Sequence, residues 1–559
     1  MAADKIAVTL LRRLDRLAGQ RSQWESHWQE IADHMRPRKA DITKKRQTPG
    51  NKRTELIFDG TAINAAELLS ASLHGMLTNM STPWFSLRFT QPELNGDDDA
   101  KEWLELTEDV LYAAFHRSNF QEQVHELYDD LILFGTGTML VEPDAETTFR
   151  FSTRHIAEVY LAEDEKGRVD TVYRKFRMFA RAAVSQFGAD KVGDTILKTE
   201  ERDPYEMVSI IHVVLPRDDR DKRKKNKTNK PFASYYIDPE EKIVLDESGY
   251  DELPYVVPRW LKSSYELGWG RSPAMNALAD TKVLQKMSEI TLRAAQKQID
   301  PPLMVPDDGF MLPIRTVPGG LNFYRSGTRD RLEPLQIGAN NPLGLNMEEQ
   351  RRAAIRQAFY VDQLIMGQGP QMTATEVIQR TEEKMRLLGP VLGRLQAEML
   401  QPLINRCWNI MLRAKQLPAP PPDMMGMDLE IEYVSPLAKA QKQSEVQAVV
   451  RMLEMMQPLA GIDPTILDYI DSDGLAKHVI KVLGIPAAVV RGDREIALLR
   501  EDRAAQQQQQ QEMAQMAQMA QAAGQAAPAM DSLNEMAGSP EDMAPDELAQ
   551  LELIEGGAV

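Results

Sequence analysis

The order of apolar and polar positions predicts that the chain begins with a series of helices. Within residues 1–35, two sets of apolar residues recur at helical spacing: Leu10, Leu14 and Leu17, then Trp24, Trp28 and Ile31. The same period predicts helices over residues 58–80, 101–116 and 120–134, with Ser118-Asn119 separating the last two.

After Gly135-Thr136-Gly137 the period changes to that of β-strands. Between residues 138 and about 245, short runs rich in β-branched and aromatic residues predominate, at 139–141, 169–176, 207–215 and 234–237. A single helix is predicted among them, over residues 181–187. Helices followed by mixed strands predict an α+β body.

The longest uninterrupted helical pattern begins at Ser272-Pro273, a hydroxyl N-cap followed by proline at the first helical position. No glycine or proline occurs from there to Ile299, and Asp300-Pro301-Pro302 ends the pattern. At 1.5 Å per residue such a helix is ~40 Å long. This length suits a strut that extends beyond one globular core.

Two faces of this helix differ in chemistry. An apolar stripe is predicted to pack, and four cations lie beside it, with Glu289 among them: the stripe is Val283, Met287, Ile290 and Ala294, and the cations are Lys282, Lys286, Arg293 and Lys297. One interpretation is a solvated face of a core helix. The other is a strut packed against copies of itself, with cations turned toward a polyanion.

An insertion rich in proline and glycine follows over residues 301–345 and predicts a small turn-rich β unit. A return helix is predicted over 346–362, with Asn346 as its N-cap and Glu349 at capping-box spacing. A loop punctuated by glycines then precedes a long helix over 375–417, which we expect to kink at Gly389-Pro390.

The remaining chain is predicted to return a strand over residues 429–433 and then to form a compact helical domain over 436–503. From residue 506 the composition changes to glutamine, methionine and alanine with an acidic end. This tail is either solvated or a helix that orders only against neighbours.

Composition narrows the class of protein. The net charge of −17 excludes a general basic nucleic-acid binder, and no apolar run reaches the ~18 residues of a membrane span. The one cysteine, Cys407, excludes an intrachain disulfide framework and suits a protein made in the cytosol. A charged run over 217–230 contains three aspartates and no aromatic residues, which favours a solvated hairpin tip over a phosphate-binding segment.

Signals for enzymatic chemistry are weak. The eight histidines are scattered without a metal-binding spacing, and neither a P-loop nor a Gly-x-Ser-x-Gly elbow occurs. Gly268-Trp269-Gly270 is too short for a dinucleotide fingerprint. We therefore expect a structural protein with no cofactor and no metal.

Four stretches, in order and spacing, resemble the portal (head-to-tail connector) proteins of short-tailed double-stranded DNA phages. They are residues 84–87 (Trp-Phe-Ser-Leu), 129–137 (Asp-Asp-Leu-Ile-Leu-Phe-Gly-Thr-Gly), 270–275 (Gly-Arg-Ser-Pro-Ala-Met) and 372–377 (Met-Thr-Ala-Thr-Glu-Val). No single stretch is diagnostic, but four in sequence are fairly specific. The resemblance covers about residues 1–503.

The resemblance implies a phage portal fold that forms a ring, usually of twelve copies. Its parts map onto the predicted segments as a wing (1–270), a first stem helix (271–300), a clip (301–345), a second stem helix (346–362), a tunnel loop (363–372), a kinked wing helix with its return strand (373–435), a helical crown (436–505) and a tail that is disordered or a helical barrel (506–559).

The same resemblance implies a conduit at one capsid vertex of the virion, assembled in the host cytoplasm, through which double-stranded DNA is packaged and ejected. Its implied partners are further copies of the chain, the major capsid and scaffold proteins, the terminase large subunit and tail adaptor proteins, without a membrane. The site residues we assign are Lys282, Lys286, Arg293 and Lys297 near the channel, Met366, Gly367, Gln368, Gly369 and Gln371 in the tunnel loop, and Arg325, Arg329 and Arg331 for docking at the clip.

Whether the lysine face of the long helix points into the channel stays open. A non-channel structural phage protein, such as a scaffold or internal head protein, is the alternative function. A nucleic-acid-processing enzyme is a third possibility, which the absent motifs disfavour.

Overall fold

The structure is a computed structural model, and it describes residues 4–43, 53–91, 93, 97–221, 223–224, 226–266, 268–300, 303–304, 333–334, 342–364, 388–422, 429–433, 446, 449–456, 471–483, 491 and 493–536. The chain divides into two compact units, one of residues 1–95 and 103–484 and the other of residues 96–102 and 485–559.

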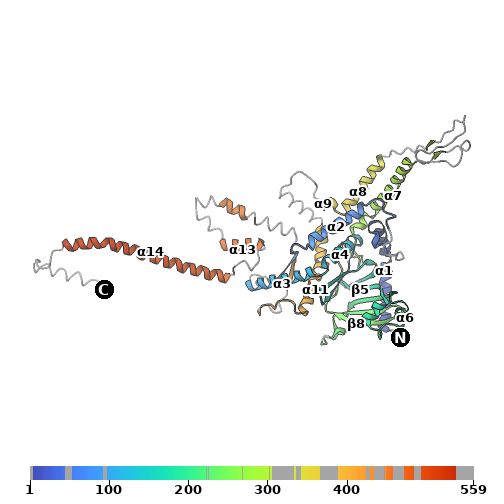
Figure 1. The fold of residues 1–559 in the computed structure, drawn as a ribbon, viewed down its shortest axis with the longest axis horizontal. Helices are drawn as coiled ribbons and strands as arrows, with labels where there is room; N and C mark the ends of the chain where they lie inside the picture. Colours follow the sequence, from blue (N-terminus) through green and yellow to red (C-terminus); the bar gives the residue numbers. More distant parts are fainter. Residues whose placement is uncertain are drawn as a thin grey trace. The chain divides into compact units, whose positions relative to one another are not determined.

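The predicted α+β character is confirmed (Figure 1). The α-helices are α1 (Lys5–Met35), α2 (Thr61–Leu77), α3 (Asp98–Arg117), α4 (Phe120–Phe134), α5 (Ala180–Phe187), α6 (Asp194–Arg202), α7 (Pro273–Ile299), α8 (Pro342–Ala358), α9 (Val361–Leu364), α11 (Gln401–Arg413), α13 (Ser472–Leu483) and α14 (Asp493–Met536). The strands are β1 (Phe85–Phe89), β2 (Met139–Asp144), β3 (Thr148–Thr153), β4 (Val159–Glu163), β5 (Val169–Phe179), β6 (Met207–Pro216), β7 (Phe232–Asp238), β8 (Ile243–Tyr250), β9 (Tyr255–Val256), β10 (Leu303–Met304), β11 (Glu333–Pro334) and β12 (Leu429–Tyr433).

The first unit is built on a five-stranded antiparallel sheet with the order β4-β5-β6-β7-β8. Helix α1 covers one face, where Leu10 and Leu14 pack on Val213 and Ile237. Helices α5 and α6 cover the other face through an apolar cluster that includes Phe187. The sheet is therefore the middle layer of an α/β/α arrangement, and Figure 1 shows α1 alongside it.

Two smaller sheets complete the body. Strands β3, β2 and β9 form one, and the distant segments β1 and β12 pair antiparallel in the other, as expected for a strand that returns to the body. Between them, α3 and α4 contribute to an aromatic core in which Phe115 packs near Phe85, Phe120 and Phe151.

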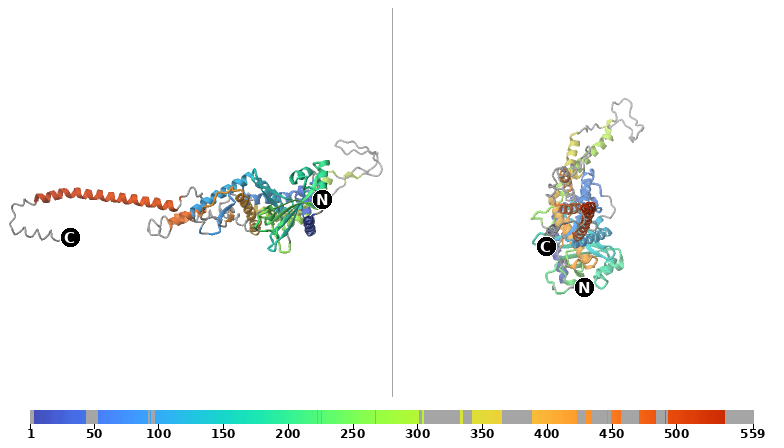
Figure 2. Two further views of the ribbon diagram at one scale, coloured as in Figure 1. Left: turned by 90° about the horizontal axis from the view of Figure 1, so that it is seen from below. Right: turned by 90° about the vertical axis from the view of Figure 1, so that its left-hand side faces the viewer.

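Helices α7 and α8 lie side by side and run antiparallel, and all views show them leaving the body together (Figures 1 and 2). Helix α7 begins as predicted, with the Ser272 hydroxyl accepting a hydrogen bond from the Met275 amide at 3.0 Å. Helix α8 differs from the prediction, because it begins at Pro342 and Asn346 lies inside it rather than at its N-cap. The helix also stops before residue 362, because Tyr360 adopts a φ of 58° and separates α8 from α9.

The apolar stripe predicted along α7 does not form the buried face of this helix within the subunit. Val283 and Ile290 are 46% and 56% exposed, whereas Leu284, Gln285 and Ser288 are buried. The buried face includes polar side chains, and Gln285 hydrogen bonds to the backbone of residues 58 and 59. Periodicity of apolar residues could not identify a face that is partly polar.

The helix that includes α11 departs from α geometry in a π-helical turn, η5 (Gln396–Leu400). Pro402 follows it and has no amide hydrogen to donate to the carbonyl of Glu398. Residues 388–395 are helical through Gly389 and Pro390, so the observed irregularity lies beyond the site where we expected a kink. Cys407, on α11, is buried.

In the second unit the structure describes α14, a helix of 44 residues, which is ~66 Å long. It continues across residue 505, where we expected the crown to end and the tail to begin. Within the described residues, no helix is long and apolar enough to cross a membrane. Most of the predicted clip and tunnel loop lies outside the described residues. The same holds for all the site residues assigned to them, which are Arg325, Arg329, Arg331, Met366, Gly367, Gln368, Gly369 and Gln371.

Candidate functional site

The helix pair α7–α8 is attached to the body at a close contact between two glycines far apart in sequence. Helix α4 ends at Gly135, which adopts a left-handed φ of 78°, and its carbonyl accepts a hydrogen bond from the Trp260 amide at 2.9 Å. The amide of Gly270 donates to the Thr136 hydroxyl at 2.9 Å. The two glycine-containing stretches that resemble phage portals therefore meet in space.

Neither glycine has room for a side chain. A Cβ at Gly135 would lie under 3.0 Å from the Gly270 carbonyl oxygen, and a Cβ at Gly270 would lie equally close to that of Gly135. The next residues reinforce the joint, because the Ser272 hydroxyl that caps α7 also donates to the Leu133 carbonyl at 2.8 Å. The start of α7 is thus fixed to the end of α4 by backbone packing.

Along their length, α7 and α8 are joined by polar contacts. Arg351 forms an ion pair with Asp280 at 2.7 Å, and the Thr291 hydroxyl donates to Glu348 at 2.7 Å. Asp280 precedes Thr291 whereas Arg351 follows Glu348, which fixes the antiparallel direction. The pair is therefore held in one register by side chains as well as by apolar packing.

Asp59, at the turn before α2, connects this pair to the N-terminal helices. Its carboxylate accepts from Arg352 at 2.9 Å and from the Thr61 amide at 2.8 Å. Burial alone would raise the pKa of Asp59, but the hydrogen bonds from Thr61 and Arg352 lower it below its usual value. Gln285 bonds to both sides of the same turn, so one short segment clamps both helices.

The four cations assigned to the channel all lie exposed on α7, but three of them have partners. Lys282 pairs with Glu30 of α1 at 3.0 Å. Lys286 and Arg293 both pair with Glu289, at 2.9 and 2.6 Å. Among the described residues, Lys297 forms no ion pair. The structure thus brings Lys286 and Arg293 together on one carboxylate and turns Lys282 toward α1.

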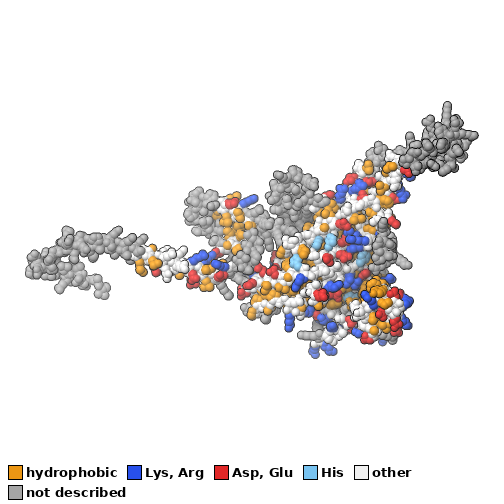
Figure 3. Space-filling view, viewed as in Figure 1, with side chains coloured by type: hydrophobic (Ala, Val, Ile, Leu, Met, Phe, Trp, Pro, Cys, Tyr) orange, Lys and Arg blue, Asp and Glu red, His pale blue; other side chains and the backbone are white. Residues whose placement is uncertain are grey.

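The exposed apolar residues of α7 lie among these charges. Val283, Ile290 and Leu292 are each about half exposed, and Figure 3 shows acidic, basic and hydrophobic side chains interspersed over the described part of this helix pair. The sequence predicted Val283 and Ile290 as part of a packing stripe, either on a core helix or on a strut that packs against copies of itself. The structure leaves them available to another surface.

Beneath the joint, a charged cluster anchors the helix that contains η5 to the body. Glu398 accepts three hydrogen bonds from Arg259, from its amide (3.0 Å), Nε (3.0 Å) and Nη2 (2.7 Å). Arg259 also pairs with Glu163, which in turn pairs with Lys262 at 2.5 Å. This cluster carried no signal in the sequence, since Arg259 lies 96 positions from Glu163 and 139 positions from Glu398.

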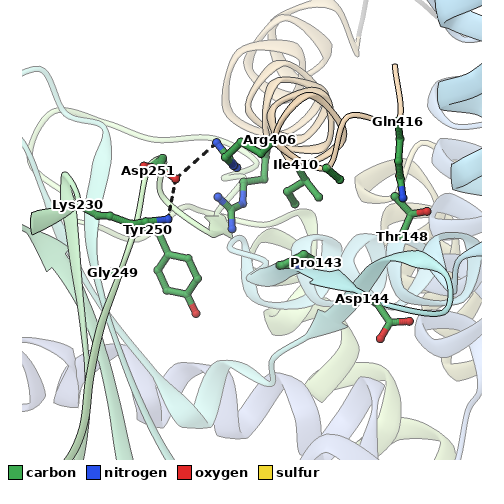
Figure 4. Close-up of a pocket in the computed structure, with 12 residues that line it drawn as sticks. Pro143, Asp144, Thr148, Lys230, Gly249, Tyr250, Asp251, Arg406, Ile410 and Gln416 are labelled. Carbon is green, nitrogen blue, oxygen red and sulfur yellow. Dashed lines mark hydrogen bonds and ion pairs between the residues drawn. The ribbon is translucent and has the colours of Figure 1, made fainter. Parts of the chain in front are cut away.

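A second charged region surrounds a cavity of about 390 Å³ between α11 and the β-strands (Figure 4). Asp251 accepts from Lys230 at 2.9 Å and lies 3.7 Å from Arg413, and Arg406 packs 5.4 Å over the Tyr250 ring. Arg406 also pairs with Glu252 at 2.7 Å. These charges compensate one another. Nowhere in the described residues are three or more His, Cys, Asp or Glu side chains grouped so as to hold a metal ion.

Comparison with known proteins identifies relatives that match most of this chain. The family model for bacteriophage head to tail connecting proteins matches residues 7–490. The "Probable portal protein" of Bordetella phage BPP-1 is 35% identical over 519 residues, covering 91% of this chain and 93% of the relative. The "Portal protein" of Salmonella phage epsilon15 is 32% identical over 508 residues, covering 89% and 91%.

A third relative, the "Portal protein" of Enterobacteria phage T3, is 21% identical over 518 residues, covering 88% of this chain and 90% of the relative. The family match spans both glycine-containing stretches, the α7–α8 pair and the body that carries them. The chain belongs to the bacteriophage head to tail connecting proteins, the family of phage portals.

Proposed function

We propose that copies of this chain, a structural component of the virion, form a ring of twelve at one capsid vertex, around a hole through which double-stranded DNA enters and leaves the head. Family membership establishes the connector function and implies oligomerisation with capsid and tail partners. The ring, its subunit count and its channel go beyond what family membership establishes and are part of our proposal.

The outward face of α7 is the observation that best supports a ring. One side of this 27-residue helix is buried in its own subunit, whereas Val283 and Ile290, two turns apart on the other side, remain about half exposed. An apolar row on a protruding helix is costly in water unless another surface covers it. In a closed ring, the head-to-tail contact of identical subunits supplies that surface for every copy.

The charges on α7 suit a conduit better than a DNA-binding site. Four cations, less their two acidic partners Glu30 and Glu289, leave a net charge of +2 on this face of each subunit. Phosphate contacts multiply around a ring, so a fully cationic lumen would retain DNA. Cations that are paired with carboxylates bind phosphate less strongly. If this face lines the channel, its charge would therefore allow DNA to pass.

Each segment has a proposed role. Residues 1–270 and 373–435 form the wing, α7 and α8 the stem, 301–345 the clip, 363–372 the tunnel loop and 436–505 the crown, with 506–559 as a tail or helical barrel. We infer that Arg325, Arg329 and Arg331 on the clip dock the terminase large subunit and later the tail adaptors. Assembly takes place in the host cytoplasm with the major capsid and scaffold proteins.

Negative-stain electron microscopy of the purified full-length chain tests this proposal. The expected images are rings with a central hole wide enough for a duplex. Compact particles without a hole would support the alternative, a non-channel head or scaffold protein. A paired test replaces Val283 and Ile290 with lysine. We expect soluble subunits that no longer form rings, whereas lysine at Met207, a residue of similar exposure on β6, leaves the rings intact.

A further inference from the structure

An apolar groove of about 330 Å³ lies between α11 and the β1–β12 sheet, on a different part of the subunit from the α7–α8 pair. Leu87 and Phe89 of β1 and Leu429 and Ile431 of β12 line its sheet side. Trp103 and Trp408, both half-buried, line the opposite side with their rings edge-on at 6.2 Å. Partly exposed tryptophans in a groove of this volume are typical of binding sites.

One edge of this two-stranded sheet is closed by side chains of α3. The Tyr112 hydroxyl accepts hydrogen bonds from the amides of Trp84 and Phe85, at 2.9 and 2.8 Å, and donates to the Phe85 carbonyl at 2.7 Å. Glu108 accepts from the Leu87 amide at 2.5 Å. The amides of Phe85 and Leu87 and the Phe85 carbonyl are therefore satisfied without another strand.

Along its other edge, β12 pairs with no further strand in the described part of the chain. Phe85 and Leu87 face Tyr433 and Ile431 in the register. Because outward-pointing residues of an antiparallel pair lie opposite each other, the backbone groups of Ile431 and Tyr433 point away from β1. Among the described residues, none hydrogen bonds to them. The same Ile431 thus presents an unpaired backbone edge and a side chain in the groove.

The face of the sheet opposite the groove is acidic along β12. Glu430 and Glu432 are about half exposed and share one cation, Arg88 of β1, at 3.1 and 3.6 Å. A strand added beyond β12 would lie beside both glutamates, on the side away from Arg88. Cross-strand pairing there favours lysine or arginine.

We propose that β12 is a docking edge for an extended segment of a partner protein in which apolar residues alternate with basic ones. Its backbone bonds to Ile431 and Tyr433, its apolar side chains enter the groove toward Trp408, and its basic side chains meet Glu430 and Glu432. In strand addition of this kind, main-chain hydrogen bonds provide the affinity, and the contacts of every second side chain provide the specificity. The inference does not depend on the DNA channel.

The test uses the full-length chain and a dye-labelled seven-residue peptide of alternating valine and lysine. We expect saturable binding by fluorescence polarisation and slower hydrogen exchange in residues 429–433 when the peptide is bound. Leu412 lines the groove and is 53% exposed, so Leu412→Lys should fold normally and weaken binding at least ~10-fold. Glu430→Gln and Glu432→Gln should each weaken it ~1.5- to 5-fold.

Met207→Lys is the matched control, since Met207 is 48% exposed and lies on another sheet. The proposal is overturned if a valine–glutamate peptide binds as tightly, or if Leu412→Lys leaves binding unchanged. It is also overturned if residues 429–433 are already protected in the peptide-free assembly, because a second copy of the chain then occupies the edge.

Discussion

Replacing Gly270 with alanine tests the joint from which α7 leaves the body. The added methyl group would lie under 3.0 Å from the Gly135 carbonyl oxygen, a distance that real Cβ contacts do not show. Both partners are backbone, so neither can rotate away. Either α7 must shift relative to α4 or the hydrogen bonds at the joint must lengthen.

The cost follows from two contributions. Overpacking in a rigid site costs about 1–3 kcal/mol. Loss of the hydrogen bonds from Gly270 to Thr136 and from Trp260 to Gly135 adds about 0.5–1.5 kcal/mol each. The sum is about 2–6 kcal/mol, which corresponds to a melting temperature lower by roughly 2–6 °C for a cooperative unit of about 480 residues.

Differential scanning fluorimetry of the purified chain measures this shift, and electron microscopy reports whether rings still form. The matched control is Gly75→Ala, because Gly75 lies within α2 with nothing inside 4 Å of an added Cβ. That variant should be stabilised by about 0.5–1 kcal/mol. If Gly270→Ala melts within roughly 1 °C of the wild type and forms normal rings, the reasoning about this joint is refuted.

Three further outcomes are expected. Reversing Lys286 and Lys297 to glutamate should leave rings intact and alter DNA packaging or retention, as measured by the DNA content of heads; disrupted rings would mean that this face is structural. Deleting residues 367–371 should spare capsid assembly and impair retention of packaged DNA, and normal DNA-filled heads would contradict the tunnel-loop role. Burial lowers the pKa of His212 from 6.5 to about 3 in the folded state. The unfolded chain therefore binds a proton at a higher pH than the folded chain does, and the free energy of unfolding decreases as pH falls from 6.5 toward 3. By pH 5 the loss is about 2 kcal/mol, and His212→Gln should show a correspondingly weaker acid sensitivity in melting curves, whereas equal sensitivity would exclude this source.

Local patterns predicted much of the fold because they act over short distances. The Ser272-Pro273 start of α7 and the end of α4 at Gly135 follow from capping chemistry and left-handed glycine. The start of α8 was missed because Pro342 begins the helix before the expected cap at Asn346. Helix α6 was not predicted at all, since its short polar sequence has only Ile196 buried.

The candidate site was harder to predict because it depends on long-range contacts. The sequence identified the cations of α7 but not their partner Glu30, which lies far away on α1. Likewise, Gly135 and Gly270 belong to two separate stretches of the sequence, and nothing local reveals that their backbones touch. Asp59 and Arg352 illustrate the same limit. Asp59 comes before α7 in the sequence and Arg352 comes after it, yet the two form an ion pair.

The burial of Cys407 makes the chain suited to site-specific labelling. It is the only cysteine, and burial raises the pKa of its thiol, so the reactive thiolate is scarce in the folded protein. A maleimide dye should therefore not react with Cys407 in the folded subunit. A cysteine introduced at Met207, which is 48% exposed on β6 and away from the proposed ring contact, would then carry one fluorophore per copy, so that stepwise photobleaching could count the subunits of each assembly directly.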